Sequence, residues 1–193
     1  MKFTQIPADT FKELQLNAGI LLRDFNVASG SFEEADMIAA TSGGVRFSAT
    51  PTFVDFGDGI DNCPANMKEL KRLDTWNAVM TGTLISIDAD SAVDLLGAAE
   101  QTASGSAQKI TPKNSLSDTD FSDVWWVGDY SNNNEGDNAG FIAVHMMSAL
   151  STGGFQIQSA DNGKGTFPFT YTAHYSMANQ DEVPFEIYIA SAE

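Results

Sequence analysis

The sequence has one cysteine, Cys63, among 193 residues. A single cysteine cannot form a disulfide within the chain and cannot supply the paired thiolates of a structural zinc site. We therefore expect Cys63 to be an ordinary, semi-buried small residue. Histidine is almost as scarce: His145 and His174 are the only two, and each lies in an alternating segment typical of a strand, outside any metal-ligand spacing. We expect both to be structural.

Long apolar runs are also missing. The longest are short pieces such as 18–22, far below the roughly 20 residues that span a bilayer. Residues 1–10 contain one lysine and no apolar stretch followed by small residues, so we expect no secretory signal. With 42% hydrophobic residues, a chain of this length is expected to form one domain, covering residues 1–193.

Basic residues are few: 10 lysines and arginines stand against 26 acidic residues, which gives a net charge of −16. Their one cluster is Lys68, Lys71 and Arg72. Binding to a phosphate backbone needs clustered cations that release counterions, so specific DNA or RNA binding is disfavoured. A large net negative charge ordinarily keeps a protein soluble. If the protein lines a passage for DNA, the same charge would also keep the DNA from adhering to the wall.

Catalytic motifs are absent. There is no glycine-rich phosphate loop with a lysine and no Gly-x-Ser-x-Gly elbow. Two acidic loops, 55–61 and 129–137, offer oxygen ligands for calcium, but neither has the alternating spacing and closing glutamate of the helix-loop-helix calcium motif, and both are typical of turns. We predict no catalytic, cofactor-binding or metal-binding residue, although an enzyme with an unusual carboxylate pair stays an open alternative.

Hydrophobic periodicity indicates a mainly β protein. Capping-box patterns at Thr10 and Ser31 predict short helices that run to about residues 16 and 39, and Thr41 to Gly44 would end the second. A similar pattern at Ser91 predicts a helix to about residue 101, followed by a loop to residue 108. Alternation from Val45 to Phe53 predicts a strand in which Pro51 indicates an edge or a bulge. Further strands are predicted at 20–25, 76–87, 121–127, 140–147, 155–159, 166–175 and 183–189.

These elements predict an antiparallel β-sandwich or barrel of about seven strands with a flanking helix, a long loop at 56–73 and terminal arms. In the strand at 76–87 we expect Val79, Thr81 and Thr83 on one face, with Met80 and Leu84 interrupting the polar face. The adjacent Trp125 and Trp126 point to opposite faces of a strand. Both faces must then be covered, either by the helix and a neighbouring subunit or within one large core.

Three segments carry a family resemblance: residues 43–53 (GGVRFSATPTF) with the long loop to Leu73, residues 76–83 (WNAVMTGT) and residues 14–22 (LQLNAGILL). With the closing strands, these are similar to the major tail proteins, or tail tube proteins, of siphophages and prophages of Gram-positive bacteria. The likeness lies in the order of the segments and in short stretches of sequence, and it covers nearly the whole chain. It includes no catalytic signature.

The resemblance implies a tail tube fold that assembles into stacked six-fold rings around a DNA channel, in a virion tail made in the host bacterial cytoplasm. It implies that the loop 56–73 and an N-terminal arm, about residues 1–25, bridge subunits and rings, with Phe56, Ile60, Met67 and Leu70 as candidate interface residues. The implied partners are other copies of the chain, the tape measure, tail terminator and distal tail proteins, and DNA in transit only. The implied role needs no cofactor and no membrane.

Two other classes stay open. A capsid decoration or head-tail connector protein can share a small β-sandwich and an acidic surface. A soluble carbohydrate- or ligand-binding β-sandwich would use an exposed Trp125 or Trp126 beside an acidic loop as its platform. The apolar residues of the long loop favour an interface, because a sugar site would need clustered exposed aromatic residues next to polar groups.

Overall fold

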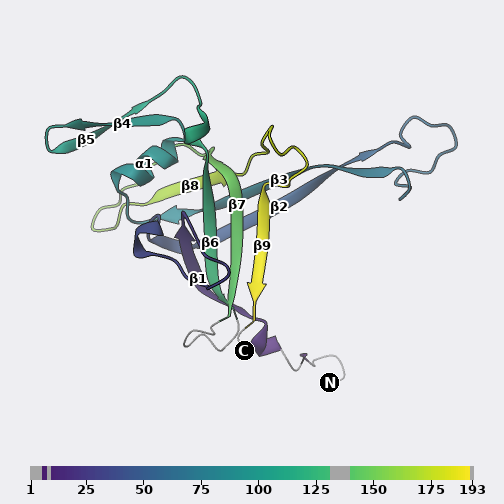
Figure 1. The fold of residues 1–193 in the computed structure, drawn as a ribbon, viewed down its shortest axis with the longest axis horizontal. Coiled ribbons are helices and arrows are strands. Elements are labelled where there is room, and N and C mark those ends of the chain that lie inside the picture. The colour runs from purple at the N-terminus through teal and green to yellow at the C-terminus, as the bar shows by residue number, and fades with distance from the viewer. Residues whose placement is uncertain (1–5, 8–9, 131–139, 192–193) are drawn as a thin grey trace.

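The computed structural model describes residues 6–7, 10–130 and 140–191. Most of this chain is β structure, as predicted, with one α-helix in the part described (Figure 1). None of the described helices is long and apolar enough to cross a membrane. In chain order the elements are η1 (Thr10–Lys12), β1 (Gln15–Leu22), η2 (Glu34–Asp36), β2 (Thr41–Asp55), β3 (Lys71–Leu84), α1 (Ala89–Leu96), β4 (Ala99–Ser104), β5 (Ala107–Pro112), η3 (Asp118–Asp120), β6 (Ser122–Tyr130), β7 (Phe141–Ser151), β8 (Phe167–Thr172) and β9 (Phe185–Ala190).

Seven of the strands form one curled antiparallel sheet, in the order β1-β6-β7-β8-β3-β2, with β9 also paired to β7. Strand β7 joins the two halves: residues 141–146 pair with β9, and Leu150 and Ser151 pair with β8. Strands β4 and β5 form a separate two-stranded hairpin beside α1. The predicted antiparallel fold of about seven strands with a flanking helix is confirmed.

The main core fills the inside of the curl. Met80 and Leu84 of β3 and Met146 of β7 are completely buried there. The strand predicted at 166–175 is found as β8, and of the five residues expected on its apolar face Phe167, Phe169, Tyr171 and Ala173 are buried in this core. The fifth, Tyr175, lies beyond the end of β8 and is exposed. Both faces of β3 were expected to be partly covered, with Met80 and Leu84 on the polar face. In the structure Val79, Thr81 and Thr83 are half-buried, whereas Met80 and Leu84 lie on the fully buried face, so the assignment of those two to a polar face was wrong.

A second, smaller core covers the opposite face of β6. Trp125 is buried there with Phe25 and Val127, and its indole ring lies 3.9 Å from the His145 ring and nearly parallel to it. Trp126 faces the main core, and its indole nitrogen donates a hydrogen bond to the Ala18 carbonyl at 3.0 Å. Two cores of the same chain therefore cover both tryptophans, so neither of the two arrangements expected for this pair is found.

The helices were predicted less accurately than the strands. The two predicted N-terminal helices are the single 3₁₀ turns η1 and η2, and residues 41–44 belong to β2 rather than to a helix end. The capping box of η2 is formed by Glu33 and Asp36 instead of Ser31. Helix α1 is capped by Asp88 and ends at Gly97, whose φ of 73° only glycine adopts easily. A one-turn capping motif cannot sustain a helix without an apolar face behind it.

Two further predictions were wrong. Residues 101–108, expected to be a loop, form most of the β4–β5 hairpin, which turns at Gly105. Residues 155–159, expected to be a strand, contribute only an isolated bridge between Gln158 and Thr166. Both strands of the β4–β5 hairpin are almost entirely exposed, so they lack the alternating apolar pattern that predicts a half-buried strand.

Candidate subunit interface

Strands β2 and β3 continue past the curled sheet as a long hairpin that projects from one side of the molecule (Figure 1). Their pairing runs without interruption from Phe53 with Leu73 to Asp55 with Lys71. Strand β2 is the last strand of the sheet, so Pro51 lies on an edge strand, one of the two positions expected for it. The hairpin end thus extends well beyond the core.

The hairpin tip, residues 56–70, is an ordered turn region. The Phe56 amide donates a hydrogen bond to the Leu70 carbonyl at 3.1 Å. The Asp55 carboxylate accepts hydrogen bonds from the amides of Gly57 and Asn66, each at 2.9 Å. These two bonds stabilise the ionised form and lower the pKa of Asp55. The loop predicted at 56–73 is therefore this tip, with residues 71–73 belonging to β3.

Three of the four predicted interface residues lie on the surface of the tip. Phe56 is 61% exposed and Ile60 is 54% exposed, and Met67 is also exposed. Leu70 is half-buried within the tip and faces Gly57, where an added Cβ would lie 3.1 Å from the Leu70 side chain. The structure thus presents Phe56, Ile60 and Met67 to solvent, while Leu70 supports the tip from inside.

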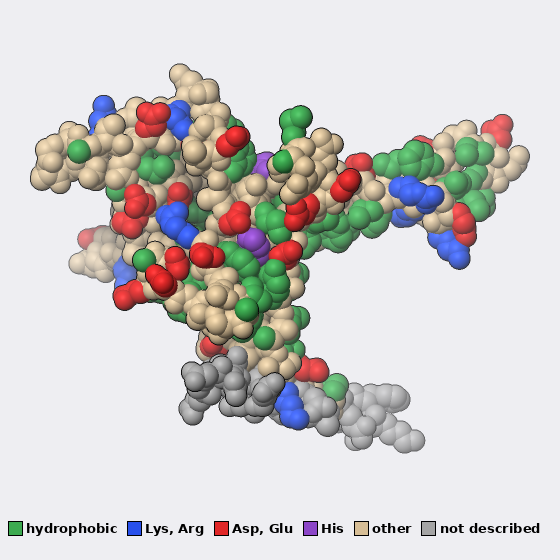
Figure 2. Space-filling view, viewed as in Figure 1, with side chains coloured by type: hydrophobic (Ala, Val, Ile, Leu, Met, Phe, Trp, Pro, Cys, Tyr) green, Lys and Arg blue, Asp and Glu red, His purple; other side chains and the backbone are tan. Residues whose placement is uncertain are grey.

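Sequence reasoning missed the apolar side chains on the strands that carry the tip. Phe53, Val54 and Leu73 are all exposed. Phe53 was assigned to the buried face of a strand because it continues the alternation that begins at Val45. No local pattern shows that the core ends before Phe53, so only the three-dimensional arrangement identifies it as surface. Figure 2 shows hydrophobic side chains along much of the projecting hairpin.

The chain's basic cluster, Lys68, Lys71 and Arg72, lies where the tip joins the start of β3. Lys68 is near Glu69, at 3.6 Å, and both side chains are exposed. The Lys71 ammonium donates to the Asn66 side chain and lies 5.3 Å from the centre of the Phe53 ring. Arg72 donates to the backbone carbonyls of Glu69 and Lys71. Neither Lys71 nor Arg72 forms an ion pair with a carboxylate in the described part of the chain, but the positive charge of Lys71 helps to lower the pKa of Asp55, its neighbour across the ladder.

Strand edges are a second kind of unpaired surface. Within the described residues, β2 and β9 each have a strand partner on one side only. Strand β9 also exposes Ile187 and Ile189. An open edge presents free N–H and C=O groups that can pair with another chain. The molecule thus combines open edges with exposed apolar side chains, a combination that favours association.

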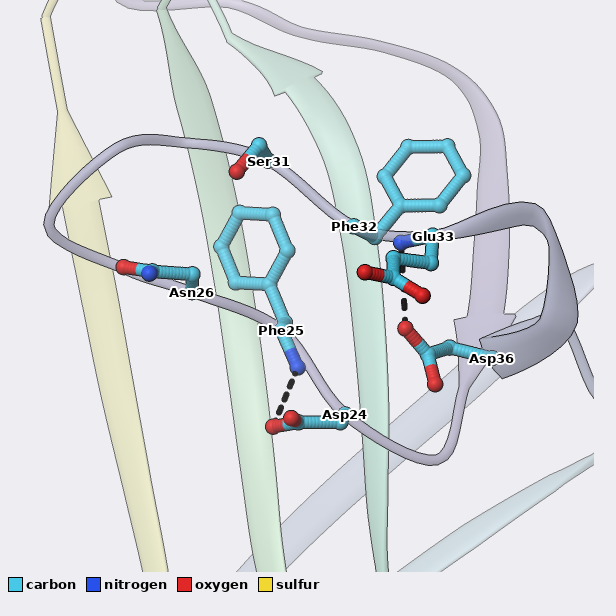
Figure 3. A pocket seen from close by; sticks show the side chains of 7 residues that line it. All are labelled: Asp24, Phe25, Asn26, Ser31, Phe32, Glu33 and Asp36. Carbon is cyan, nitrogen blue, oxygen red and sulfur yellow. Dashed lines mark hydrogen bonds between the residues drawn. The ribbon is translucent and has the colours of Figure 1, made fainter.

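An open pocket of about 420 Å³ lies in the segment between β1 and η2. Figure 3 shows the rings of Phe25 and Phe32 on one side of it and the carboxylates of Asp24, Glu33 and Asp36 below them. Asp24 accepts a hydrogen bond from the Phe25 amide, and Asp36 accepts one from the Glu33 amide. The pocket is therefore acidic with an aromatic side.

The nearest arginine in sequence does not neutralise this pocket. Arg23 forms an ion pair with Asp94 of α1 at 2.6 Å. Burial raises the pKa of Asp94, and Arg23 opposes that effect. Asp24, Glu33 and Asp36 form no ion pair with any lysine or arginine that the structure describes. The pocket keeps uncompensated negative charge.

Both histidines are held by contacts within the sheet. The Nε2 of His145 lies 2.9 Å from an Asp123 oxygen, and Glu186 is on the other side of the ring, with its carboxylate 3.6 Å from Nδ1. His174 lies 3.3 Å from the Ser148 carbonyl. In the described part of the chain, no group of three or more His, Cys, Asp and Glu residues is placed to hold a metal. Most of the acidic loop 129–137 lies outside the described residues.

The predicted N-terminal arm, about residues 1–25, is only partly described, because residues 1–5 and 8–9 lie outside the description. Its later part is strand β1, which pairs with β6 and has a bulge between Leu16 and Ile20. Gly19 in that bulge has a φ of 70° and lies so close to Trp126 that any Cβ would clash. Residues 15–22 are therefore an integral part of the sheet.

Comparison with known proteins gives few matches. No protein-family model matches this chain, and no curated protein does. A chain in the virion of a native gene transfer agent particle is 12% identical, with a TM-score of 0.43 over 90% of this chain and 96% of that one. A chain in the tail of an empty gene transfer agent particle, computed with C6 symmetry, is 14% identical, with a TM-score of 0.43 over 82% and 92% of the two chains. At these values, neither likeness identifies a function.

Proposed function

We propose that this chain is a structural virion protein, the tail tube protein of a long-tailed phage or prophage, whose copies assemble into stacked rings around a channel for the genome. We further propose that the rings are hexameric. The observation that carries the proposal is the projecting β2–β3 hairpin, which exposes Phe56 and Ile60 far from the core. Apolar side chains that stay exposed to water do not stabilise the fold of a monomer.

Burial of these side chains can drive association. Removing a large apolar side chain fully from water stabilises a contact by about 1.5–3 kcal/mol. Phe56, Ile60 and Met67 are partly shielded already, so each would contribute less than that range. Together with pairing at an open strand edge, they would contribute apolar surface to a contact between copies.

The net charge fits the channel of such a tube. Six chains of −16 carry about a hundred negative charges per ring. An acidic lumen repels DNA phosphates, so the genome slides through without adhering. The same charge makes subunits repel one another, and at physiological ionic strength screening acts over roughly 8 Å. Salt should therefore favour assembly.

Electron microscopy of the purified chain, over a range of concentrations and salt levels, tests this proposal. We expect rings or hollow rods with an axial repeat, more abundant as salt increases. Rods that form only at low ionic strength would contradict the electrostatic part. A chain that stays monomeric at every concentration and salt level would contradict self-assembly and would favour a capsid decoration or head-tail connector protein.

The partners of such a tube would be the tape measure, tail terminator and distal tail proteins, with DNA only in transit. The carbohydrate-binding alternative is less well supported by the structure. Its platform would be an exposed Trp125 or Trp126, but Trp125 is 7% exposed and Trp126 packs against the main core. Neither ring is presented for stacking on a sugar.

A further inference from the structure

Strand β9 has few anchors besides its hydrogen bonds with β7, beside which it runs in Figure 1. The described chain places no strand on its other side. Phe185 packs against the main core and Tyr188 against the second core. Ile187 and Ile189, between and beyond them, are exposed. Any further link between β9 and its neighbours therefore has a large influence on whether this edge strand stays attached.

His145 of β7 supplies such a link, because its ring lies between a carboxylate of β6 and a carboxylate of β9. Its Nε2 is 2.9 Å from Asp123, a hydrogen-bond distance, and its Nδ1 is 3.6 Å from Glu186, within reach of an ion pair but too long for a hydrogen bond. The Trp125 indole is stacked on the ring at 3.9 Å. The His145 side chain is only 13% exposed. One imidazole thus joins three neighbouring strands.

The Nδ1 atom makes this link depend on a proton. It is buried and has no hydrogen-bond partner in the described chain. In the neutral ring, the hydrogen bond to Asp123 places the single proton on Nε2, so Nδ1 turns a lone pair towards the Glu186 carboxylate. A second proton, on Nδ1, replaces this unfavourable contact by an attraction between opposite charges. The face of the Trp125 indole favours a cationic ring as well.

The groups around the ring leave His145 as the one that changes charge near neutral pH. Asp123 on β6 and Glu186 on β9 face it, and neither forms an ion pair with a lysine or arginine that the structure describes. The Tyr188 hydroxyl of β9 donates a hydrogen bond to Glu186, and this bond raises the pKa of Tyr188. Carboxylates are ordinarily charged and phenols neutral between pH 5 and 8, the range in which histidine titrates.

We propose that His145 is a proton-dependent link: the protonated ring fastens β9 to β6 and β7, and loss of the Nδ1 proton loosens β9. Because the folded arrangement favours the bound proton, the stabilisation is present at mildly acidic pH and is lost as the pH rises. Since β9 is an edge strand, the link determines whether the sheet presents β9 or β7 to its surroundings. The link operates within one chain and does not depend on the proposed assembly.

Hydrogen exchange tests the link, with β8 as a reference in the same molecule. Low ionic strength is suitable, because the acidic chains should then repel one another most. From about pH 5.5 to about pH 8, protection of the amides of 185–190, corrected for the intrinsic effect of pH, should fall roughly fivefold or more. Protection of 167–172 should change less than about twofold. Equal changes in the two strands, or none in β9, would overturn the proposal.

Glu186→Gln isolates the charge that Nδ1 faces, because glutamine keeps an oxygen for the Tyr188 hydroxyl. This variant should reduce the pH dependence of β9 protection to less than about twofold. Glu182→Gln is the matched control: this exposed glutamate precedes β9 and accepts a hydrogen bond from Asn179, which glutamine can also accept. It should keep the full pH dependence. A dependence that survives in Glu186→Gln would assign the effect to another group.

His174→Gln is a second control. It removes the other histidine, whose ring nitrogen lies beside a backbone carbonyl, and it should leave the pH dependence of β9 intact. Loss of the dependence in this variant would contradict the role of His145.

The ¹⁵N chemical shifts of the His145 ring show where its protons are. At about pH 8 the proton should be on Nε2 alone, and at about pH 5.5 both nitrogens should be protonated. A neutral ring with its proton on Nδ1 would already satisfy Glu186, and that result would overturn the proposed link.

Discussion

The two ends of strand β3 have opposite environments. At the end nearer α1, Met80 and Leu84 are completely buried in the main core. At the other end, Leu73 is half exposed and leads into a tip where Phe56 is 61% exposed. One continuous strand pair thus contributes both to the body of the fold and to a projection that carries apolar surface. Apolar residues in the first part stabilise the core, whereas those in the second are exposed and contribute little to it.

The two regions are also held together differently. The body is stabilised by side chains from seven strands that pack inside the curl. The projection is held by the hydrogen bonds of a two-stranded ladder and by small local contacts, such as Cys63 against the sulfur of Met67 at 3.5 Å. An isolated two-stranded hairpin is only marginally stable in water. A partner that covers the projection would therefore also make it more rigid.

The largest effect should follow from making the tip polar. Phe56→Ser combined with Ile60→Ser should raise the concentration needed for assembly more than tenfold, because the apolar surface of the contact is lost. The free energy of unfolding of the monomer should change by less than about 1 kcal/mol for the pair, since both side chains are exposed. Sedimentation and urea unfolding measure the two quantities.

Leu116→Ser is the matched control for these tip substitutions, because Leu116 is equally exposed but lies on the body. It should leave assembly unchanged. If the tip variant instead lost several kcal/mol of stability, the distinction between the two regions would be wrong.

Core truncation should have the converse effect. Leu84→Ala should lower the free energy of unfolding by about 2–5 kcal/mol, because it leaves a cavity in the main core. Leu73→Ala, on the same strand, should cost less than about 1 kcal/mol. Urea unfolding of the two variants compares the ends of β3 directly. Equal losses would mean that the hairpin is part of the cooperative core.

Removing the cap of α1 should have a smaller effect. The Asp88 carboxylate accepts a hydrogen bond from the Ser91 amide at 2.8 Å, and this bond lowers the pKa of Asp88. Asp88→Ala should cost about 1 kcal/mol, whereas Asp88→Asn, which keeps a capping oxygen, should cost less. Assembly should be unaffected, since α1 belongs to the body. Thermal unfolding with sedimentation of the same samples checks both expectations.

The smallest effect should be a pH dependence at η3. A hydrogen bond from Lys113, at 2.5 Å, and one from the Ser117 amide lower the pKa of Asp120 from 3.8 to about 2. Because the pKa is lower in the folded state, the stabilisation is present above about pH 4 and is lost as the pH falls towards 2. Asp120→Asn should be less stable than the unaltered chain at neutral pH, and the difference should shrink below pH 4. A difference that stays constant with pH would contradict this assignment.

Hydrophobic periodicity predicted the strands of the body well where one face of a strand is apolar and the other is polar. Phe167, Phe169 and Tyr171 alternate with polar residues, so the buried face of β8 could be read directly. Strand β3 was harder, because Val79 and Met80 are both apolar and lie on opposite faces. Only the curl of the sheet determines which of them is enclosed.

The candidate site could be predicted in part. The length of the segment after Asp55 indicated a functional loop, and the resemblance to tail tube proteins implied Phe56, Ile60 and Met67 as interface residues. The structure exposes these three side chains, and their role at an interface stays a prediction. The pocket at Asp24, Glu33 and Asp36 could not be predicted, because the sequence around Ser31 indicates a helix and the pocket forms where the chain makes a single 3₁₀ turn. Its acidic residues become neighbours only after the segment folds back beside β1.

The most direct test of the account is to shorten the hairpin. Replacing residues 54–72 with a two-residue Asn-Gly turn joins the paired Phe53 and Leu73 and removes the whole tip. We expect a monomer that unfolds cooperatively at nearly the same temperature and forms no rings or rods at concentrations where the unaltered chain does. Rods of normal appearance from the shortened chain would contradict the claim that the projecting hairpin exists for assembly.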